Sequence, residues 1–382
     1  MTGGRGRAED EPKAAAGEPA GVVVLGGAGF VGRAIAAEYL ARGRAVTVLD
    51  RRPPAAELTS GGARWLDVDV LSDEIPDLPP GDVVLSLGSS DPRPRWPWTL
   101  PANNALATAR MLPALAGRRV ILLSSVEVYG SAPPPLAEHT RPVLPWTTRQ
   151  VDDWCDAAAR LAAEPCPPWR AAPLGRAMAQ AAGGGRWVYA LSKLAQERLV
   201  ARITPAGRLT ILRMANICGI GQDRVICRLI RGALAGDPLT VTATQRSFVP
   251  LPTAAAVVAA GLPGGSFNVG GESAWLPDIA REIRDLCGSA SALEVREPPA
   301  GDSCGVVDTA RLAAAGHRVP PVGSYLAGLA AELKADQPPR FDPPLPVVVP
   351  PRAVRPDEVA ARQQSSLWSG QIKHGARWSR QL

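Results

Sequence analysis

The sequence is poor in the residues that bind metals and form disulfides. Only three histidines occur in 382 residues, His139, His317 and His374, and none lies near another candidate ligand in the sequence. The six cysteines form no C-x-x-C pair, so neither a zinc ribbon nor a redox dithiol is indicated. We therefore expect no metal site, and a reduced, cytoplasmic compartment fits the cysteine pattern best.

Long apolar runs and strong charge are missing as well. No run is long enough to span a bilayer, and residues 1–20 have no apolar core of a signal peptide, so we expect them to form a disordered leader. The net charge of +6 is mild for this length, and the arginines are scattered rather than gathered in a stripe. These features predict neither a membrane nor a nucleic acid as a partner.

Strand-like and helical patterns alternate from Gly21 onward. Apolar, β-branched runs predict strands at Val22–Leu25, Ala45–Leu49, Val83–Leu87, Val120–Leu123 and Leu209–Leu212. Helical spacing lies between them, at Ala34–Arg42, Asn103–Leu115 and Ser192–Arg202. This alternation predicts an α/β Rossmann fold, with a doubly wound parallel sheet, over residues 21–215.

The pattern after residue 215 is more broken and predicts a smaller, C-terminal substrate-binding lobe over residues 216–335. Helices are expected at Val225–Ala235 and Leu276–Cys287, and short strands of this lobe at Leu239–Val241, Ser247–Val249 and Phe267–Val269. We expect the lobe to lie against the strand ends, where open α/β sheets bind ligands.

Two further segments stand apart. Residues 138–186 form an insertion, which is either a surface excursion with small helices of its own or a functional lid or oligomer contact. Residues 336–382 are a Pro-rich tail, which is either an extended arm or disordered.

A glycine-rich turn directly follows the first strand. Gly26, Gly29 and Gly32 form a G-x-x-G-x-x-G pattern that allows a tight turn, a close approach of the backbone to a pyrophosphate, and close packing of helix on strand. The next helix begins here, and its N-terminus favours anions. We therefore expect the three glycines, with Phe30 and Val31, to bind a dinucleotide.

Asp50 ends the second predicted strand, where a carboxylate accepts hydrogen bonds from both ribose hydroxyls and repels a 2′-phosphate. NAD is therefore the expected cofactor. Arg51 and Arg52 follow at once and leave NADP open. Arg51 itself is a further expected cofactor contact. At the ends of the next strands, we expect contacts from Asp69 (with Asp67 as the alternative), Val70 and Leu87.

Tyr189-x-x-x-Lys193 is the strongest catalytic signal. Positions i and i+4 lie on one helix face. An ammonium group beside a phenol favours the phenolate, so Lys193 is expected to lower the pKa of Tyr189. Ser125 ends a strand upstream and supplies a hydroxyl to the same site.

Together these motifs resemble the extended short-chain dehydrogenase/reductase family, the NAD-dependent epimerase/dehydratase group. The likeness covers roughly residues 21–335. The matching segments are Gly26–Gly32, Asn104 with Thr108, Ser124–Gly130, Tyr189–Lys193, Arg213–Asn216, Asn268–Gly271 and Asp308–Leu312.

The resemblance implies a role for each matching residue. Tyr189 takes the proton of a substrate hydroxyl, Ser125 binds the reacting oxygen, and Lys193 binds the nicotinamide ribose. Asn216 and Arg246 fall where relatives hold the diphosphate of a nucleotide sugar. The resemblance also implies a homodimer, formed through a four-helix contact of the helices that hold Asn104 and Tyr189.

Glu127 is a tentative further catalytic residue. It lies two positions after Ser125, so both side chains point the same way if the strand continues. A carboxylate can remove the C5 proton that a C4 ketone acidifies. Dehydratases and decarboxylases of the resembling group often carry Glu here, and simple 4-epimerases usually do not. The alternative is a supporting polar or helix-capping role.

Several positions depart from the resembling family. Ser86–Ser89 replaces the usual His-Leu-Ala-Ala, Leu251–Ala254 replaces the usual His-Val-Asp-Asp, and the second diphosphate arginine is missing near Gly301, where Arg296 is a substitute. Cys218 replaces the usual tyrosine and is expected to pack rather than react. These changes favour an unusual sugar of a specialised biosynthetic pathway.

The sequence thus predicts an NAD-dependent enzyme that oxidises a hydroxyl of a nucleotide sugar, at C4, with epimerisation as the favoured outcome. A 4,6-dehydratase, a decarboxylase or a 4-ketoreductase that uses Glu127 is the alternative. A non-catalytic dinucleotide-binding sensor or scaffold is a further alternative, which the retained Ser125, Tyr189 and Lys193 disfavour.

Overall fold

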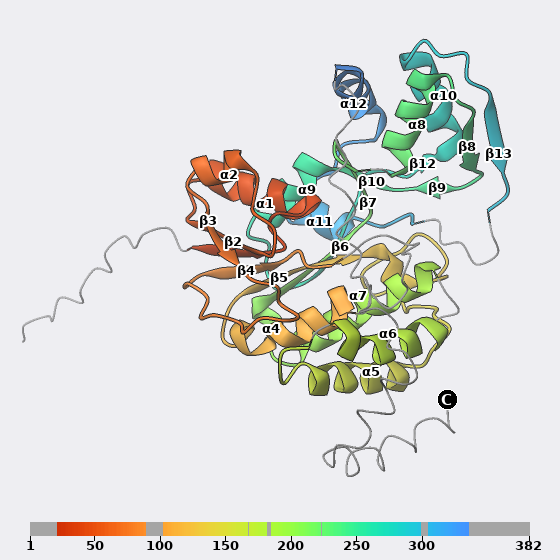
Figure 1. Ribbon diagram of the computed structural model, residues 1–382. Helices are drawn as coiled ribbons and strands as arrows, with labels where there is room; N and C mark the ends of the chain where they lie inside the picture. Colours follow the sequence, from red (N-terminus) through yellow and green to blue (C-terminus); the bar gives the residue numbers. More distant parts are fainter. Residues whose placement is uncertain are drawn as a thin grey trace, which may run out of the picture. The chain divides into compact units, whose positions relative to one another are not determined.

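The central feature of the molecule is a seven-stranded sheet in the order β11-β6-β5-β4-β1-β2-β3, with every pair parallel (Figure 1). The computed structural model describes residues 21–88, 102–166, 168–181, 185–222, 224–298 and 305–335. The strands are β1 (Val22–Leu25), β2 (Val46–Asp50), β3 (Arg64–Asp67), β4 (Asp82–Leu85), β5 (Val120–Ser125), β6 (Leu209–Met214) and β11 (Gly265–Val269). The predicted doubly wound Rossmann sheet is confirmed.

Helices cover both faces of this sheet, because its strands are apolar on both sides. One face packs against α1 (Phe30–Ala41), α2 (Ala56–Ser60), α9 (Leu251–Val258) and α11 (Ala310–Ala314). The other face packs against the π-helical turn η1 (Ala102–Leu106), α4 (Ala107–Leu115) and α7 (Gly185–Ala201). Chain order reverses between β1 and β4, which creates a crevice at the carboxyl ends of the strands.

A smaller lobe is built on its own apolar cluster, from α8 (Val225–Ala235), α10 (Leu276–Leu286) and α12 (Gly323–Ala335). Short pairs complete it: β8 (Leu239–Thr242) with β13 (Leu293–Arg296), and β9 (Gln245–Arg246) with β12 (Ala274–Trp275). A third pair, β7 (Asn216–Cys218) with β10 (Phe248–Pro250), joins the lobe to the end of β6.

The lobe is not one continuous stretch of chain. Phe267–Val269 was expected to be one of its strands, and that prediction is wrong: β11 pairs with β6 at the edge of the main sheet. The helices α9 and α11 likewise pack on the main sheet. The chain therefore passes from the sheet to the lobe and back more than once. Segments of the main sheet and its helices occur after residue 216, where the lobe was predicted to begin.

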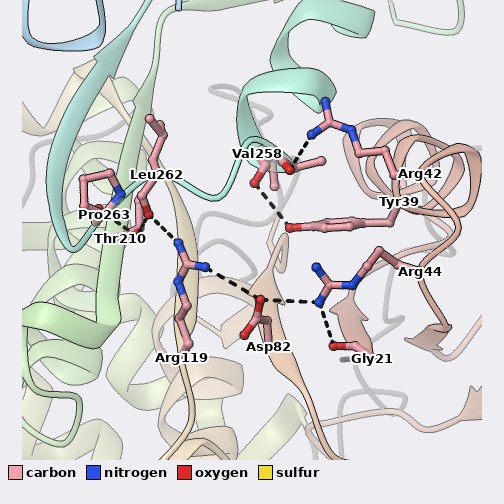
Figure 2. Close-up of polar contacts among 11 residues, drawn as sticks. Gly21, Tyr39, Arg42, Arg44, Asp82, Arg119, Thr210, Val258, Leu262 and Pro263 are labelled. Carbon is pink, nitrogen blue, oxygen red and sulfur yellow. Dashed lines mark hydrogen bonds and ion pairs between the residues drawn. The ribbon is translucent and has the colours of Figure 1, made fainter. Parts of the chain in front are cut away.

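The amino edge of the sheet is closed by polar contacts far from the strands' carboxyl ends (Figure 2). The carboxylate of Asp82, at the start of β4, lies 3.7 Å from the guanidinium of Arg44 and 3.9 Å from that of Arg119. The phenol of Tyr39 on α1 donates to the carbonyl of Val258 at 3.2 Å. The contact of Tyr39 ties α9 to α1 and thereby anchors the segment between the lobe and β11.

The insertion forms two helices, α5 (Thr148–Leu161) and α6 (Pro168–Ala181). Thr147 and Gln150 make a reciprocal capping box at the start of α5. Both helices pack beside α4 and α7, on the side away from the sheet (Figure 1). The 3₁₀ turns η2 (Val126–Tyr129) and η3 (Ala206–Arg208) complete the elements. The predicted leader and tail, residues 1–20 and 336–382, lie outside the described residues.

Across the described ranges, no helix has both the length and the apolar character that a membrane span requires. The same part of the chain contains no group of three or more His, Cys, Asp or Glu side chains arranged to hold a metal ion.

Candidate functional site

One cavity of about 850 Å³ lies at the carboxyl ends of the sheet strands and continues into the lobe. Its walls come from the glycine-rich turn, the ends of β4, β5 and β6, helix α7, and α8 and β8 of the lobe. A site at this place has the position expected for a ligand of a doubly wound sheet.

The glycine-rich turn has the shape that a pyrophosphate requires. Gly26 has a φ of +74°, a backbone conformation that residues with a side chain rarely adopt. A Cβ on Gly32 would lie 2.1 Å from the carbonyl oxygen of Gly26, so only glycine allows α1 to pack this closely on the turn. Gly29 caps α1 without a side-chain hydrogen bond, and the first turn of α1 holds no acidic residue. The helix N-terminus is therefore available to an anion, which fits a dinucleotide.

The predicted cofactor residues divide into two groups. Gly29, Phe30, Val31, Gly32 and Leu87 line the cavity. Gly26, Asp50, Arg51, Asp69 and Val70 lie next to it in the turn or at neighbouring strand ends but are not among the lining residues. Their roles toward a cofactor stay predictions.

Asp50 is linked to the glycine-rich turn itself. Its carboxylate accepts hydrogen bonds from the backbone N–H of Ala28 at 3.1 Å and of Arg52 at 3.0 Å. The guanidinium of Arg51 lies 3.3 Å from the carboxylate of Asp69, which is just past the end of β3. A carboxylate at the end of the second strand disfavours a 2′-phosphate, so Asp50 keeps NAD as the expected cofactor.

Val70 is a core residue in this structure. Its side chain is buried in the apolar cluster beneath α4, and its carbonyl accepts from Nε of Arg110 at 3.1 Å. A cofactor contact from Val70 therefore has to come from its backbone.

Ser125, Tyr189 and Lys193 all line the cavity, as the resemblance implies. Ser125 ends β5, and its hydroxyl is hydrogen-bonded to that of Tyr189 on α7. Lys193, one helical turn later, is buried and donates from Nζ to the carbonyls of Leu123 at 3.0 Å and Leu87 at 3.5 Å. The fold thus brings together three side chains that the sequence separates by up to 68 positions.

The electrostatics of this group differ from the expectation. Burial raises the pKa of Tyr189 to about 12; the hydrogen bond with Ser125 opposes that shift, the charge of Glu127 adds to it, and the charge of Arg224 opposes it. Burial lowers the pKa of Lys193 to about 8, and the charge of Glu197 opposes that change. The net shift of the Tyr189 pKa is therefore upward, opposite to the lowering expected from Lys193, because desolvation is the largest cause.

Glu127 lines the cavity, but not for the reason expected. The strand does not continue past Ser125: residues Val126–Tyr129 turn into a 3₁₀ helix, and the backbone N–H of Glu127 donates to Oγ of Ser125 at 3.2 Å. The expected strand-end alternation is wrong at this position. The turn nonetheless brings the Glu127 carboxylate close enough to Tyr189 for its charge to act on the phenol.

Asn216 and Arg246 line the part of the cavity that lies toward the lobe. The side-chain amide of Asn216 donates to the carbonyl of Ser247 at 3.0 Å. Both side chains border Gly305, where a Cβ would lie 3.8 Å from Nδ2 of Asn216 and 4.0 Å from Nη1 of Arg246. Arg296, considered as a substitute for a missing arginine, also lines the cavity.

Three of the four arginines in this wall belong to the lobe, and two were not anticipated from the sequence. Arg224 and Arg228 line the cavity together with Arg246 and Arg296. Arg224 immediately precedes α8, and it faces the chemical group closely enough for its charge to lower the pKa of Tyr189. Four guanidinium groups around one cavity favour a strongly anionic ligand.

Cys218 also lines the cavity and is buried. Its thiol contacts the carbonyl of Val249 and the hydroxyl of Tyr325, each at 3.4 Å. Burial raises the pKa of this thiol to about 12, so it stays protonated at neutral pH. The packing role expected for Cys218 fits these surroundings.

A buried polar network below the cavity was missed by sequence reasoning. Glu197, on α7, accepts hydrogen bonds from Oγ of Ser124 at 2.5 Å and from Nε of Arg213 at 3.0 Å. Arg213 in turn donates to the hydroxyl of Tyr129 at 3.0 Å, and that hydroxyl donates to Asn268 on β11 at 2.7 Å. The network joins α7 to the ends of three strands. A Glu four residues after Lys193 was the only sequence signal for it.

Comparisons with known proteins were made with this geometry in hand. A model of the NAD dependent epimerase/dehydratase family matches residues 22–151 and 172–258, which is more than half of the chain. Among curated proteins, the chain is similar to dTDP-6-deoxy-L-talose 4-dehydrogenase (NAD(P)(+)) from Kitasatospora kifunensis. The two are 28% identical over 324 residues, which cover 75% of this chain and 85% of that protein.

Three solved structures illustrate the fold. MoeE5 in complex with UDP-glucose and NAD has a TM-score of 0.61 and 22% identity, over 82% of this chain and 99% of that one. The Bordetella bronchiseptica enzyme WbmG in complex with NAD and UDP has a TM-score of 0.63 and 19% identity, over 85% and 96%. UDP-glucose 4-epimerase from Thermotoga maritima with UDP-glucose has a TM-score of 0.62 and 16% identity, over 82% and 99%. At these identities the likeness establishes the fold alone.

Proposed function

Because the chain belongs to the NAD-dependent epimerase/dehydratase family, we propose that it is an NAD-dependent enzyme that oxidises a hydroxyl of a nucleotide sugar at C4. The observation that carries the proposal is the hydrogen-bonded pair of Ser125 and Tyr189, which shares one cavity with Lys193 and with four arginines. A reactive phenol at one end and guanidinium groups at the other suit a sugar that carries a diphosphate.

The residues of the chain divide the chemical work. NAD held by the glycine-rich turn and α1 would supply the hydride acceptor and a positively charged ring. Ser125 and Tyr189 hold the reacting hydroxyl between them, and Tyr189 removes its proton once it is in the phenolate form. Lys193 lies one helical turn away and favours the phenolate while it carries its proton.

The arginine wall fits the diphosphate of the substrate. Arg246 and Asn216 are the proposed main ligands, and Arg296 is the proposed second arginine. Similar proteins support this substrate class: MoeE5 and the Thermotoga maritima epimerase were solved with UDP-glucose, and the Kitasatospora kifunensis enzyme is a 4-dehydrogenase of a dTDP-sugar.

Epimerisation is the outcome we propose for the reaction. The Glu127 carboxylate in the same cavity favours the second candidate, a 4,6-dehydratase, decarboxylase or 4-ketoreductase. A carboxylate near the reacting carbon can remove the proton that a neighbouring ketone acidifies. The candidates differ in product mass: epimerisation leaves it unchanged, dehydration loses water, decarboxylation loses carbon dioxide, and ketone reduction adds two hydrogens.

Incubation with a panel of UDP- and dTDP-sugars plus NAD, followed by mass spectrometry, tests the proposal. An unchanged mass with an altered retention time supports epimerisation, loss of water supports dehydration, and a change of two hydrogens supports net redox. Tyr189→Phe is the control and should be inactive in every case. Absence of any product with the wild type, together with no NAD binding in calorimetry, would overturn the proposal.

A further inference from the structure

The helices α4 and α7, with η1, have two apolar faces. One faces the sheet, through residues such as Leu106, Met111 and Val200. The other faces away from the sheet and belongs to a separate apolar cluster. Its members on these helices are Ala105, Ala109, Val188, Leu191, Ala195 and Leu199, all buried. Because α7 carries Tyr189 and Lys193, whatever covers this second face also supports the chemical group.

The cover comes from the same chain. The α5–α6 hairpin, residues Thr148–Ala181, packs its own apolar side chains on this face, among them Val151, Trp154, Ala158 and Met178. Figure 1 shows both helices beyond α4 and α7, on the side opposite the sheet. The predicted surface excursion is therefore a third layer of the molecule.

Three tryptophans join the hairpin to the catalytic helix. Trp146 precedes α5, and its ring meets that of Trp154 edge-to-face, with centroids 6.3 Å apart. Trp146 also meets Trp187 edge-to-face at 6.1 Å, and Trp187 lies on α7 only two residues before Tyr189. Such aromatic pairs add to the stability that burial alone provides.

Three ion pairs close the edge of the same contact, one of them between Arg202 and Asp152 at 3.6 Å. Arg198 on α7 lies 2.8 Å from Asp152 on α5, and Arg202, just after α7, lies 2.6 Å from Asp156. The thiol of Cys155 on α5 is buried against the carbonyl of Ala195 at 3.7 Å. The hairpin thus contacts α7 over several turns, through packed apolar side chains and through ion pairs.

The side chains of the hairpin that the structure describes offer no exposed large apolar group to a further partner. Among the described residues, the exposed large hydrophobic side chains are Trp65, Val143, Trp275, Leu286 and Val295, and none lies on α5 or α6. Stable subunit contacts need a well-packed apolar centre.

We propose that the α5–α6 hairpin takes the place of a second subunit: it covers the outer face of α4 and α7 within the chain, so the protein is active as a monomer. The homodimer expected through the helices of Asn104 and Tyr189 would need this same face, which the hairpin covers. The proposal does not rest on the proposed reaction, because it concerns packing alone.

Two solution measurements test the proposal on the full-length protein. Light scattering coupled to size exclusion should give the mass of one chain, 40.0 kDa, at every concentration loaded. Hydrogen exchange should find residues 188–199 protected to the same degree at the lowest and highest concentrations. A dimer, with protection of α4 and α7 that grows with concentration, would overturn the proposal.

Trp154→Ala tests the cover directly, with Arg149→Ala on the exposed side of α5 as the matched control. We expect Trp154→Ala to lower Tm by about 5 °C or more, to bind a hydrophobic dye and to self-associate, because the face of α7 becomes accessible. Arg149→Ala should behave as the wild type. An unchanged Tm and a monomeric mass for Trp154→Ala would contradict the cover.

A milder variant keeps the test decisive if Trp154→Ala does not fold. Asp152→Asn combined with Asp156→Asn removes all three ion pairs without disturbing the apolar contact. Faster hydrogen exchange in both α5 and residues 188–199, with the exchange of β1 unchanged, is the expected result. Faster exchange in α5 alone would show that the hairpin does not support α7, and would also contradict the proposal.

Discussion

Glu197 and Arg213 form a buried ion pair, with Oε2 of Glu197 2.8 Å from Nη2 of Arg213. The pair lies directly behind the chemical group: Glu197 is one helical turn after Lys193, and Ser124, which also donates to Glu197, precedes Ser125. A single carboxylate therefore faces the charge of Lys193 and holds the end of β5.

Glu197→Gln should weaken both functions of this carboxylate. The charge that raises the pKa of Lys193 is removed, so that pKa should fall below about 8 and the basic limb of the kcat profile should move to lower pH. The unpaired Arg213 should reduce stability by about 3 kcal/mol. Asp156→Asn, which breaks the exposed pair with Arg202, is the control and should leave the pH profile unchanged. A profile that does not move in Glu197→Gln would refute the electrostatic role.

Tyr189→Phe should lower kcat by about 100-fold or more, since proton transfer by a positioned side chain contributes at least this much. NAD binding, measured by calorimetry, should persist, because the glycine-rich turn is untouched. Tyr39→Phe is the matched control: it removes a hydroxyl that donates to Val258 at the opposite edge of the sheet. It should cost about 1 kcal/mol of stability and leave kcat unchanged. If Tyr189→Phe kept full biological activity, a binding role without catalysis would be supported instead.

Lys193 should make stability depend on pH. Its pKa is about 8 in the folded chain, against 10.5 as the ordinary value. Between these values the unfolded chain holds the proton and the folded chain does not, so this lysine makes the free energy of unfolding rise with pH across that window. Above pH 10.5 Lys193 costs the folded chain nothing. As pH falls through about 8, its burial lowers the free energy of unfolding by about 3 kcal/mol in all.

Denaturant titrations of the wild type and Lys193→Met between about pH 7 and pH 10 measure this contribution. The buried thiols and phenols with raised pKa act in the opposite direction at high pH, so the difference between the two proteins isolates the lysine. Lys193→Met should be the more stable protein at pH 7, by an amount that shrinks toward pH 10. A constant difference would mean that Lys193 has an ordinary pKa.

Gly32→Ala should abolish measurable NAD binding. The added Cβ would lie 2.1 Å from the carbonyl oxygen of Gly26, which forces α1 away from the turn that holds the pyrophosphate. Gly207→Ala is the control, because a Cβ there meets nothing within 4 Å. Calorimetric titration with NAD and a Tm measurement separate loss of binding from loss of fold. Normal affinity in Gly32→Ala would place the cofactor elsewhere.

The sequence predicted those elements whose signal is local. The helix Val225–Ala235 has the bounds expected, and the strand and turn around the three glycines follow from residue type and spacing. The pairing of β11 was missed because an apolar run such as Phe267–Val269 does not reveal which strand it will join. Glu197 was missed because an acidic residue on a helix ordinarily faces solvent, and only the fold shows that it is buried.

The residues of the candidate site could be predicted from the sequence, but their pKa values could not. Ser125, Tyr189 and Lys193 were identified by motif, and the structure places them in one cavity. Their protonation depends on desolvation, which a sequence does not contain. Arg224 was not anticipated for the same reason: its importance comes from its position opposite Tyr189, across more than thirty residues of chain.

The repeated passage of the chain between sheet and lobe limits how this protein can change. The strands β7 and β10 lie at the junction of the main sheet and the lobe. After the lobe, the chain returns to the main sheet as its outer strand β11. Such interlaced parts cannot be exchanged as a cassette or expressed as separate halves, since either fragment would leave a sheet edge without its neighbour.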